Sequence, residues 1–235
     1  MITLLAIVGS FLGVMIVMTL HEFAHAFVAY KCGDPTPKFY GRLTLNPIKH
    51  FDPLGILMLA LAHFGWAKPV PVNPNNFKNY RLGSFLTSAA GITVNYLSAF
   101  LFCPIWVLVN LYVLPHIQGL PMYYLMGAFF DSLVVCSLTF CIFNLLPFYP
   151  LDGFRMIDAC TKRQGKVYLF LRQYGYYILL GLILLHFLSG RTPFLYRIDI
   201  LGYVLNFAKT IFAEPIILFW EWIFRLCGVP LQIIF

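Results

Sequence analysis

The chain has 235 residues, of which 60% are hydrophobic and 11% are charged, and its mean hydropathy is +0.81. Soluble proteins average about 45–50% apolar and 25% charged residues, so this composition excludes an ordinary soluble domain and indicates a protein whose partner is the lipid bilayer. The net charge of +7 comes from 16 Lys and Arg against 9 Asp and Glu. Because the basic residues cluster between apolar stretches, as topogenic charges do, we expect no nucleic-acid partner.

The first predicted element is a membrane-spanning helix at Ile2–Tyr30, because about 20 apolar residues rising 1.5 Å each cross a bilayer. Its start lacks the basic residues and the short apolar run of a cleavable signal peptide, so we expect it to stay in the mature protein. Near its end the sequence reads HEFAH, which brings His21, Glu22 and His25 into an apolar segment. Ionisable groups within membrane helices are functional by default, although groups near a helix end also extend to water.

A basic loop follows, with seven Lys and Arg between Lys31 and Arg81. It contains the apolar run DPLGILMLALAHFGW, which is too short to span a bilayer, and the stretch AKPVPVNPNNF, whose prolines cannot continue a helix. We expect these stretches to form a re-entrant or membrane-associated loop.

Further spans are predicted from the remaining apolar stretches, at Ser84–Leu114, Met122–Pro147 and Tyr168–Leu188. Residues 200–235 contain either another span or an amphipathic helix at the interface. The expected fold is therefore an all-α polytopic membrane protein, a helical bundle of about four to six transmembrane helices. No internal repeat or long linker divides it, so we expect a single membrane-embedded domain over residues 1–235, with the motifs in about 1–160 and C-terminal helices in about 168–235.

The distribution of Lys and Arg predicts the orientation of these spans. Seven basic residues lie between Lys31 and Arg81 and five between Arg155 and Arg172, whereas the turn at Pro115–Pro121 has none. Under the positive-inside rule the two basic loops are cytoplasmic, and the N-terminus and the Pro115 turn lie outside.

The HEFAH motif has the residue types and spacing of a zinc hydrolase. Residues four apart share one face of a helix, so His21 and His25 can direct both imidazoles at one metal ion. Glu22 lies beside that ion and can handle the proton of a water molecule. A catalytic zinc site usually takes three protein ligands, so a third ligand must come from another segment.

Depth in the membrane distinguishes two carboxylates, Asp131 and Asp152, which are the charged residues between Leu82 and Phe154. His21 lies ~28 Å along the first helix, near the cytoplasmic side, whereas Asp131 lies only ~14 Å into a span that enters from outside. Asp152 follows two prolines on the cytoplasmic side, so it matches the histidines in depth and is the predicted third ligand. The alternative for Asp152 is a helix-end carboxylate near Arg155, and we expect Asp131 to be a hydrogen-bonded structural carboxylate facing the bundle.

With HEFAH and NLLPFYPLDG the sequence resembles the site-2 protease family of intramembrane zinc metalloproteases, in which an HExxH motif is paired with a distant LDG motif. It is similar to the small bacterial members without a PDZ domain through GRLTLNPIKHFDPLG, FGWAKPVPVNPNNF and AGITVNY. The resemblance covers roughly residues 15–160. It implies that His21, His25 and Asp152 hold one Zn²⁺ per chain and that Glu22 is the general base.

The resemblance also implies a role for two asparagines, Asn95 and Asn144, in binding the substrate backbone or the developing oxyanion. Hydrogen bonding between helices is the alternative role of such amides. The family commonly has Gly-Pro before the first of these asparagines, where this chain has Gly91-Ile92, and this departure concerns the helix geometry at Asn95. The segment AKPVPVNP is similar to the family's membrane-associated loop, which implies that it lies near the active site, where its edge can pair with an unwound substrate.

The expected function is therefore that of an intramembrane zinc metalloprotease, which hydrolyses peptide bonds within or near transmembrane segments of membrane-protein substrates. Its expected place is the bacterial inner or plasma membrane, as a multi-pass protein with the active site toward the cytoplasmic side. One alternative is a metal-ion transporter, which would need paired sites or inverted repeats. The other is a catalytically silent membrane scaffold, which would typically have lost Glu22 or a ligand. The sequence indicates no particular oligomeric state.

Overall fold

The computed structural model describes residues 2–55, 67–162, 164–190 and 192–229. Within these ranges the chain forms helices, and its β-structure consists of an isolated bridge between Phe51 and Ala67. The apolar run predicted to be re-entrant falls largely on residues 56–66, which lie outside the described residues.

Five of the described helices are long and apolar enough to cross a membrane. They are α1 (Ile2–Lys31), α4 (Tyr80–Leu108), α5 (Pro121–Leu145), α7 (Lys166–Ser189) and α9 (Ile200–Leu226). The short elements are α2 (Thr36–Phe39), η1 (Pro47–Lys49), η2 (Pro74–Asn76), η3 (Val109–Val113), η4 (Leu114–Ile117), α6 (Asp152–Cys160) and α8 (Pro193–Tyr196). The predicted class, an all-α polytopic membrane protein with four to six spans, is confirmed.

The predicted spans are present. Some of their ends differ from the predicted ones, because single residues such as a helix cap or a proline fix where a helix begins or stops. Helix α4 begins four residues early because Asn79 caps it, its side chain accepting a hydrogen bond from the Leu82 amide at 3.1 Å. Helix α5 ends at Leu145, two residues before Pro147. In the C-terminal region α9 runs unbroken through Pro215, so this region holds one long helix.

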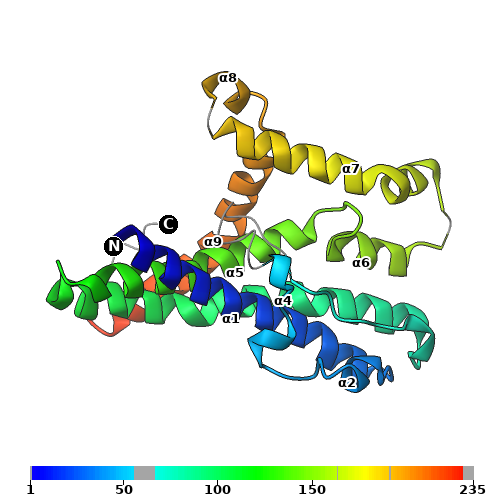
Figure 1. The fold of residues 1–235 in the computed structure, drawn as a ribbon, viewed down its shortest axis with the longest axis horizontal. Coiled ribbons are helices and arrows are strands. Elements are labelled where there is room, and N and C mark those ends of the chain that lie inside the picture. Colours follow the sequence, from blue (N-terminus) through cyan, green and yellow to red (C-terminus); the bar gives the residue numbers. More distant parts are fainter. Residues whose placement is uncertain (1, 56–66, 163, 191, 230–235) are drawn as a thin grey trace.

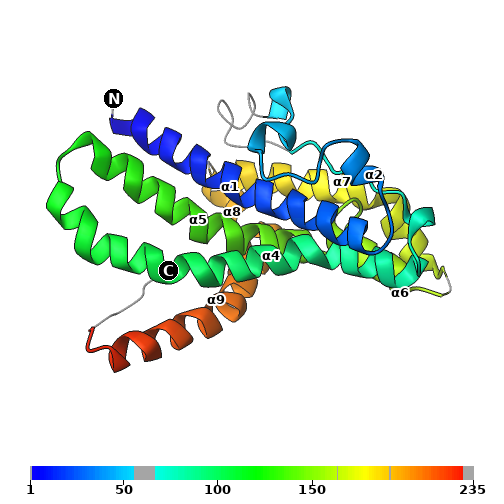
Figure 2. The same ribbon diagram turned by 90° about the horizontal axis from the view of Figure 1, so that it is seen from below.

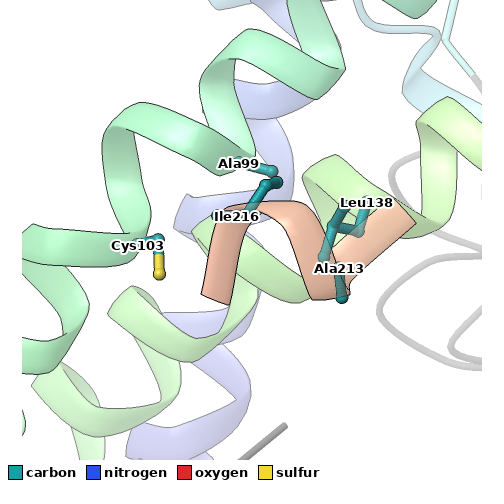
Figure 3. Close-up of a cluster of buried hydrophobic side chains, with 5 residues drawn as sticks. All are labelled: Ala99, Cys103, Leu138, Ala213 and Ile216. Atoms are coloured by element: carbon teal, nitrogen blue, oxygen red, sulfur yellow. The ribbon is translucent and has the colours of Figure 1, made fainter. Parts of the chain in front are cut away.

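Helices α1, α4 and α5 lie side by side and form the packed centre of the molecule (Figures 1 and 2). Helix α9 closes one side of it, where Ala213 and Ile216 pack against Ala99 and Cys103 of α4 and Leu138 of α5 (Figure 3). Helix α7 lies apart from α1 and α4 (Figure 1). Its first turn is joined to α6 by the stacked rings of Tyr168 and Phe154, whose centroids are 5.6 Å apart.

Two buried ionic side chains hold the extended segment Lys68–Asn76 against the end of α1. Arg42 is 4% exposed and donates hydrogen bonds to the carbonyls of Lys49, Lys68 and Pro69, the last two at 3.0 and 3.1 Å. Asp34, which is fully buried, accepts from the Asn73 amide at 2.7 Å and the Asn76 side chain at 2.8 Å. This segment is thereby fixed beside HEFAH.

Candidate metal centre and active site

The HEFAH residues lie in the last third of α1, where both histidines are buried and directed to one side. His21 and His25 are each 8% exposed, and their Nε2 atoms are 3.0 Å apart. The four-residue spacing places both rings on one helix face, as predicted. Each ring therefore offers an Nε2 atom to the same point.

Asp152 meets the histidines from the opposite side of the site. It is the first residue of α6, and its Oδ2 atom lies 3.3 Å from Nε2 of His21 and 3.1 Å from Nε2 of His25. Gly153 allows this approach, since a Cβ atom there would lie 2.6 Å from the carbonyl carbon of Leu145. The segment between α5 and α6 thus folds back closely enough to bring Asp152 to the imidazoles.

These three side chains have the separations that a tetrahedral zinc ion requires. Zinc bonds of about 2.0–2.2 Å to nitrogen and oxygen set neighbouring ligand atoms about 3.3 Å apart, and the separations here are 3.0, 3.1 and 3.3 Å. Among the described residues, His21, His25 and Asp152 are the one group of three His, Cys, Asp or Glu side chains that could hold a metal ion. The donor set of two imidazoles and a carboxylate fits zinc.

The state of Asp152 also suits a ligand. Its Oδ2 atom is buried and receives no hydrogen bond of normal geometry from any residue that the structure describes. Burial would raise the pKa of Asp152, but the neighbouring His25 and His21 imidazoles hold that pKa well below its usual range. The side chain is therefore a buried carboxylate whose Oδ2 atom faces both imidazoles, which is the form that binds a cation.

Glu22 lies beside these three candidate ligands but is not one of them. The side chain is partly buried, and its Oε2 atom accepts a hydrogen bond of 3.1 Å from the backbone amide of Val70. Val70 belongs to the extended segment Lys68–Asn76, so the loop predicted near the active site does reach it. A carboxylate held by one backbone donor beside a metal site can still accept a proton at its other oxygen.

A cavity of about 600 Å³ opens onto these residues. Its walls come from α1, the extended segment, the first turns of α4 and the link between α5 and α6. Its lining residues include Glu22, Val70, Tyr80, Tyr149 and Arg155. The cavity mixes apolar rings and prolines with a few charged groups.

The two predicted substrate-binding asparagines lie in different places. Asn144, near the end of α5, lines the cavity, and its side-chain nitrogen donates to the Phe140 carbonyl at 3.0 Å. Asn95 is fully buried behind His21, with its side-chain nitrogen 3.0 Å from Nδ1 of that ring, and it is absent from the described residues that line the cavity. Substrate binding by either residue stays a prediction.

Asp131 lies away from this centre. Its carboxylate accepts a hydrogen bond from the indole nitrogen of Trp106, on an exposed face of α5. The predicted hydrogen bond is present and joins α5 to α4, where Trp106 is partly buried, although Asp131 itself is exposed.

Two contacts of the centre come from backbone groups, which sequence patterns do not reveal. The Val70 amide donates to Glu22, and the Thr87 carbonyl of α4 lies 2.7 Å from Nδ1 of His25. Two signals pointed to an extended segment around Val70: its proline-rich composition and its similarity to the family's membrane-associated loop.

Comparison with known proteins finds relatives named as zinc metalloproteases. The chain is 46% identical over 140 residues to "Putative zinc metalloprotease YwhC" of Bacillus subtilis, a match that covers 60% of this chain and 63% of the relative. It is 30% identical over 183 residues to "Putative zinc metalloprotease Rip2" of Mycobacterium tuberculosis, covering 76% of this chain and 67% of the relative. A protein of the same name from Mycolicibacterium smegmatis is 28% identical over 190 residues.

The chain thus spans less than two thirds of the length of the Bacillus relative. No family model matches the chain, and no solved structure gives a significant match.

Proposed function

Because the chain belongs to the site-2 protease family of zinc metalloproteases, we propose that it is a zinc metalloendopeptidase acting inside the membrane. Its substrates are membrane proteins, cut within or near a transmembrane segment. One Zn²⁺ per chain is held by His21, His25 and Asp152, and the whole chain acts as a single membrane-embedded domain.

One observation carries this proposal: three buried ligand atoms converge beside a carboxylate that is not one of them, at the wall of a peptide-sized cavity. The Nε2 and Oδ2 atoms lie within 3.0–3.3 Å of one another, and Glu22 lines the same cavity of about 600 Å³. A transport site would need further ligands along a path. Among the described residues, this group of three is the one candidate.

The chemistry follows from the residues around the cavity. A zinc ion held by His21, His25 and Asp152 would supply Lewis-acid chemistry, polarising a carbonyl and lowering the pKa of water toward about 7. Glu22 takes a proton from the attacking water and passes it to the leaving amine, while the Val70 amide keeps the carboxylate facing the site. Asn144 lines the cavity and contacts the substrate backbone or the developing oxyanion.

The substrate reaches this site as an extended peptide. A helix uses its carbonyls in internal hydrogen bonds, so a transmembrane substrate must unwind locally before a carbonyl is open to attack. Pro69, Val70 and Val72 line the cavity, and the extended stretch that contains them offers a backbone edge to the unwound peptide. Substrates with helix-weakening residues near the cut are therefore preferred.

The proposed location is a bacterial inner or plasma membrane, with the site toward the cytoplasm. His21 and Asp152 lie at the ends of their segments that adjoin the two basic loops, Lys31–Arg81 and Arg155–Arg172, and such loops stay on the cytoplasmic side.

Glu22→Gln tests the proposal. The amide has nearly the same size but cannot take up a proton, so cleavage of co-expressed single-span proteins should fall by about 10²–10⁴-fold while zinc content stays unchanged. Glu221→Gln is the matched control, because Glu221 pairs with Arg225 one turn along α9 and is not among the described residues that line the cavity; its loss should leave cleavage at the wild-type rate.

Equal cleavage by wild type and Glu22→Gln would refute the protease. If neither protein cuts and wild type moves zinc across liposomes, transport becomes the better account.

A further inference from the structure

We propose that Asn95 is a positioning residue, which fixes the His21 ring in the tautomer that leaves Nε2 open to the metal. One face of α4 orients the rings of both His21 and His25 in this way. The inference rests on the proposed zinc site and assigns Asn95 to the rear of that site, away from the substrate.

His25 shows how α4 orients a ring. Its Nδ1 atom lies 2.7 Å from the backbone carbonyl of Thr87. A carbonyl only accepts hydrogen bonds, so Nδ1 must carry the proton. The lone pair of the neutral ring is then on Nε2, the atom that lies 3.1 Å from Asp152 Oδ2.

His21 has the same arrangement with a side chain in place of the carbonyl. Its Nδ1 atom is 3.0 Å from the amide of Asn95, a residue with 0% exposure. The Oδ1 atom of that amide has no partner among the described residues. If His21 binds a metal through Nε2, its Nδ1 carries a proton and needs an acceptor, and a half-turn of the Asn95 amide supplies Oδ1 at the same distance.

Spacing along α4 brings these groups to one face. Thr87, Gly91 and Asn95 follow one another at intervals of four residues, so they share one side of the helix. A Cβ atom on Gly91 would lie 2.6 Å from His25 Nε2 and closer still to the His21 ring. The glycine therefore lets both imidazoles rest on the helix backbone, with an acceptor on either side of them.

Partners of this kind affect metal binding strongly, because they fix both the tautomer and the direction of the ligand. Their loss typically weakens metal affinity by about 10–100-fold. The role implied by family resemblance, contact with the substrate, predicts a different effect: Asn95 substitution would raise KM and leave zinc affinity intact.

Zinc dissociation constants, measured by chelator competition on purified full-length protein, separate these roles. Asn95→Leu keeps the volume and removes the acceptor, so its zinc affinity should fall by about 10–100-fold. Asn95→Asp restores an acceptor and should bind zinc within a few-fold of wild type. The matched control is Asn110→Leu, since Asn110 donates to the Trp106 carbonyl at 2.8 Å beyond the end of α4; its zinc affinity should equal that of wild type.

The outcomes distinguish the inference from the function on which it rests. If wild type binds no zinc, the proposed function fails. If wild type and Asn95→Leu bind zinc equally, the positioning role is wrong. Unfolding of the metal-free proteins is followed in parallel, and if Asn95→Leu does not fold, Asn95→Ala replaces it under the same criteria.

Discussion

Gly91→Ala should weaken zinc binding strongly while it changes the stability of the metal-free protein far less. A Cβ atom at this position would lie 2.6 Å from Nε2 of His25, whereas ordinary contacts are about 3.5–4.0 Å. The imidazoles must therefore move by about 1 Å, since the α4 backbone is held between α1 and α5. Zinc ligands tolerate errors of only about 0.2 Å, so zinc affinity should fall by at least about 10–100-fold.

The metal-free protein should be affected far less by the same substitution. Its imidazoles line the cavity and can move into it, and alanine is favoured over glycine in a helix by about 0.5–1 kcal/mol. Gly181→Ala is the matched control, because nothing lies within 4 Å of a Cβ atom there. Zinc affinity and the thermal midpoint of the metal-free form would be measured for both variants. If Gly91→Ala bound zinc as tightly as wild type, the argument from close approach would be refuted.

Three further outcomes are expected. In metal analysis of purified protein, Asp152→Ala should lose most of its bound zinc, whereas Asp131→Asn should keep close to one zinc per chain. The reverse result would make Asp131, not Asp152, the third ligand. Single cysteines at Gln118 and Gln164 of a cysteine-free variant should react with an impermeant thiol reagent from opposite sides of the membrane, and labelling from one side would overturn the topology. Burial raises the pKa of Asp34, but hydrogen bonds from Thr36, Asn76 and Asn73 hold it below its usual range. Its stabilisation is therefore present above about pH 4 and lost as pH falls further, so the thermal midpoint of wild type should drop more on acidification than that of Asp34→Asn, and equal drops would contradict this.

The long spans could be predicted because apolar length alone nearly determines them. Their ends could not, since they depend on single groups such as the Asn79 cap of α4. The C-terminal helix α9 contains Pro215 without a break, although a proline inside a helix removes one backbone hydrogen bond.

There is a physical reason why the structure brings Asp152, and not Asp131, to the two histidines. A membrane helix advances 1.5 Å per residue from a fixed boundary, so residue number reports depth for segments that are far apart in sequence. Depth does not report rotation about the helix axis, so it could not distinguish Asn95 from Asn144, both of which the family resemblance places at the substrate. In the structure one lines the cavity and the other lies behind a histidine.

The basic loop shows what charge counting leaves out. Arg42 contributes to the positive-inside pattern, yet it is 4% exposed and bonded to three backbone carbonyls. Those bonds and the contacts of Asp34 fix the segment that carries the Val70 amide to Glu22. Composition indicates which side of the membrane the loop occupies, but tertiary contacts decide which charges are buried.

The most direct test of the account is mass-spectrometric mapping of the products from purified wild-type protein, reconstituted in liposomes with single-span membrane proteins. The account predicts new termini within or beside the transmembrane segment, formed only with zinc present, lost on chelation and recovered when zinc is restored. Intact substrates at full zinc occupancy, or cuts that persist after zinc is removed, would contradict it.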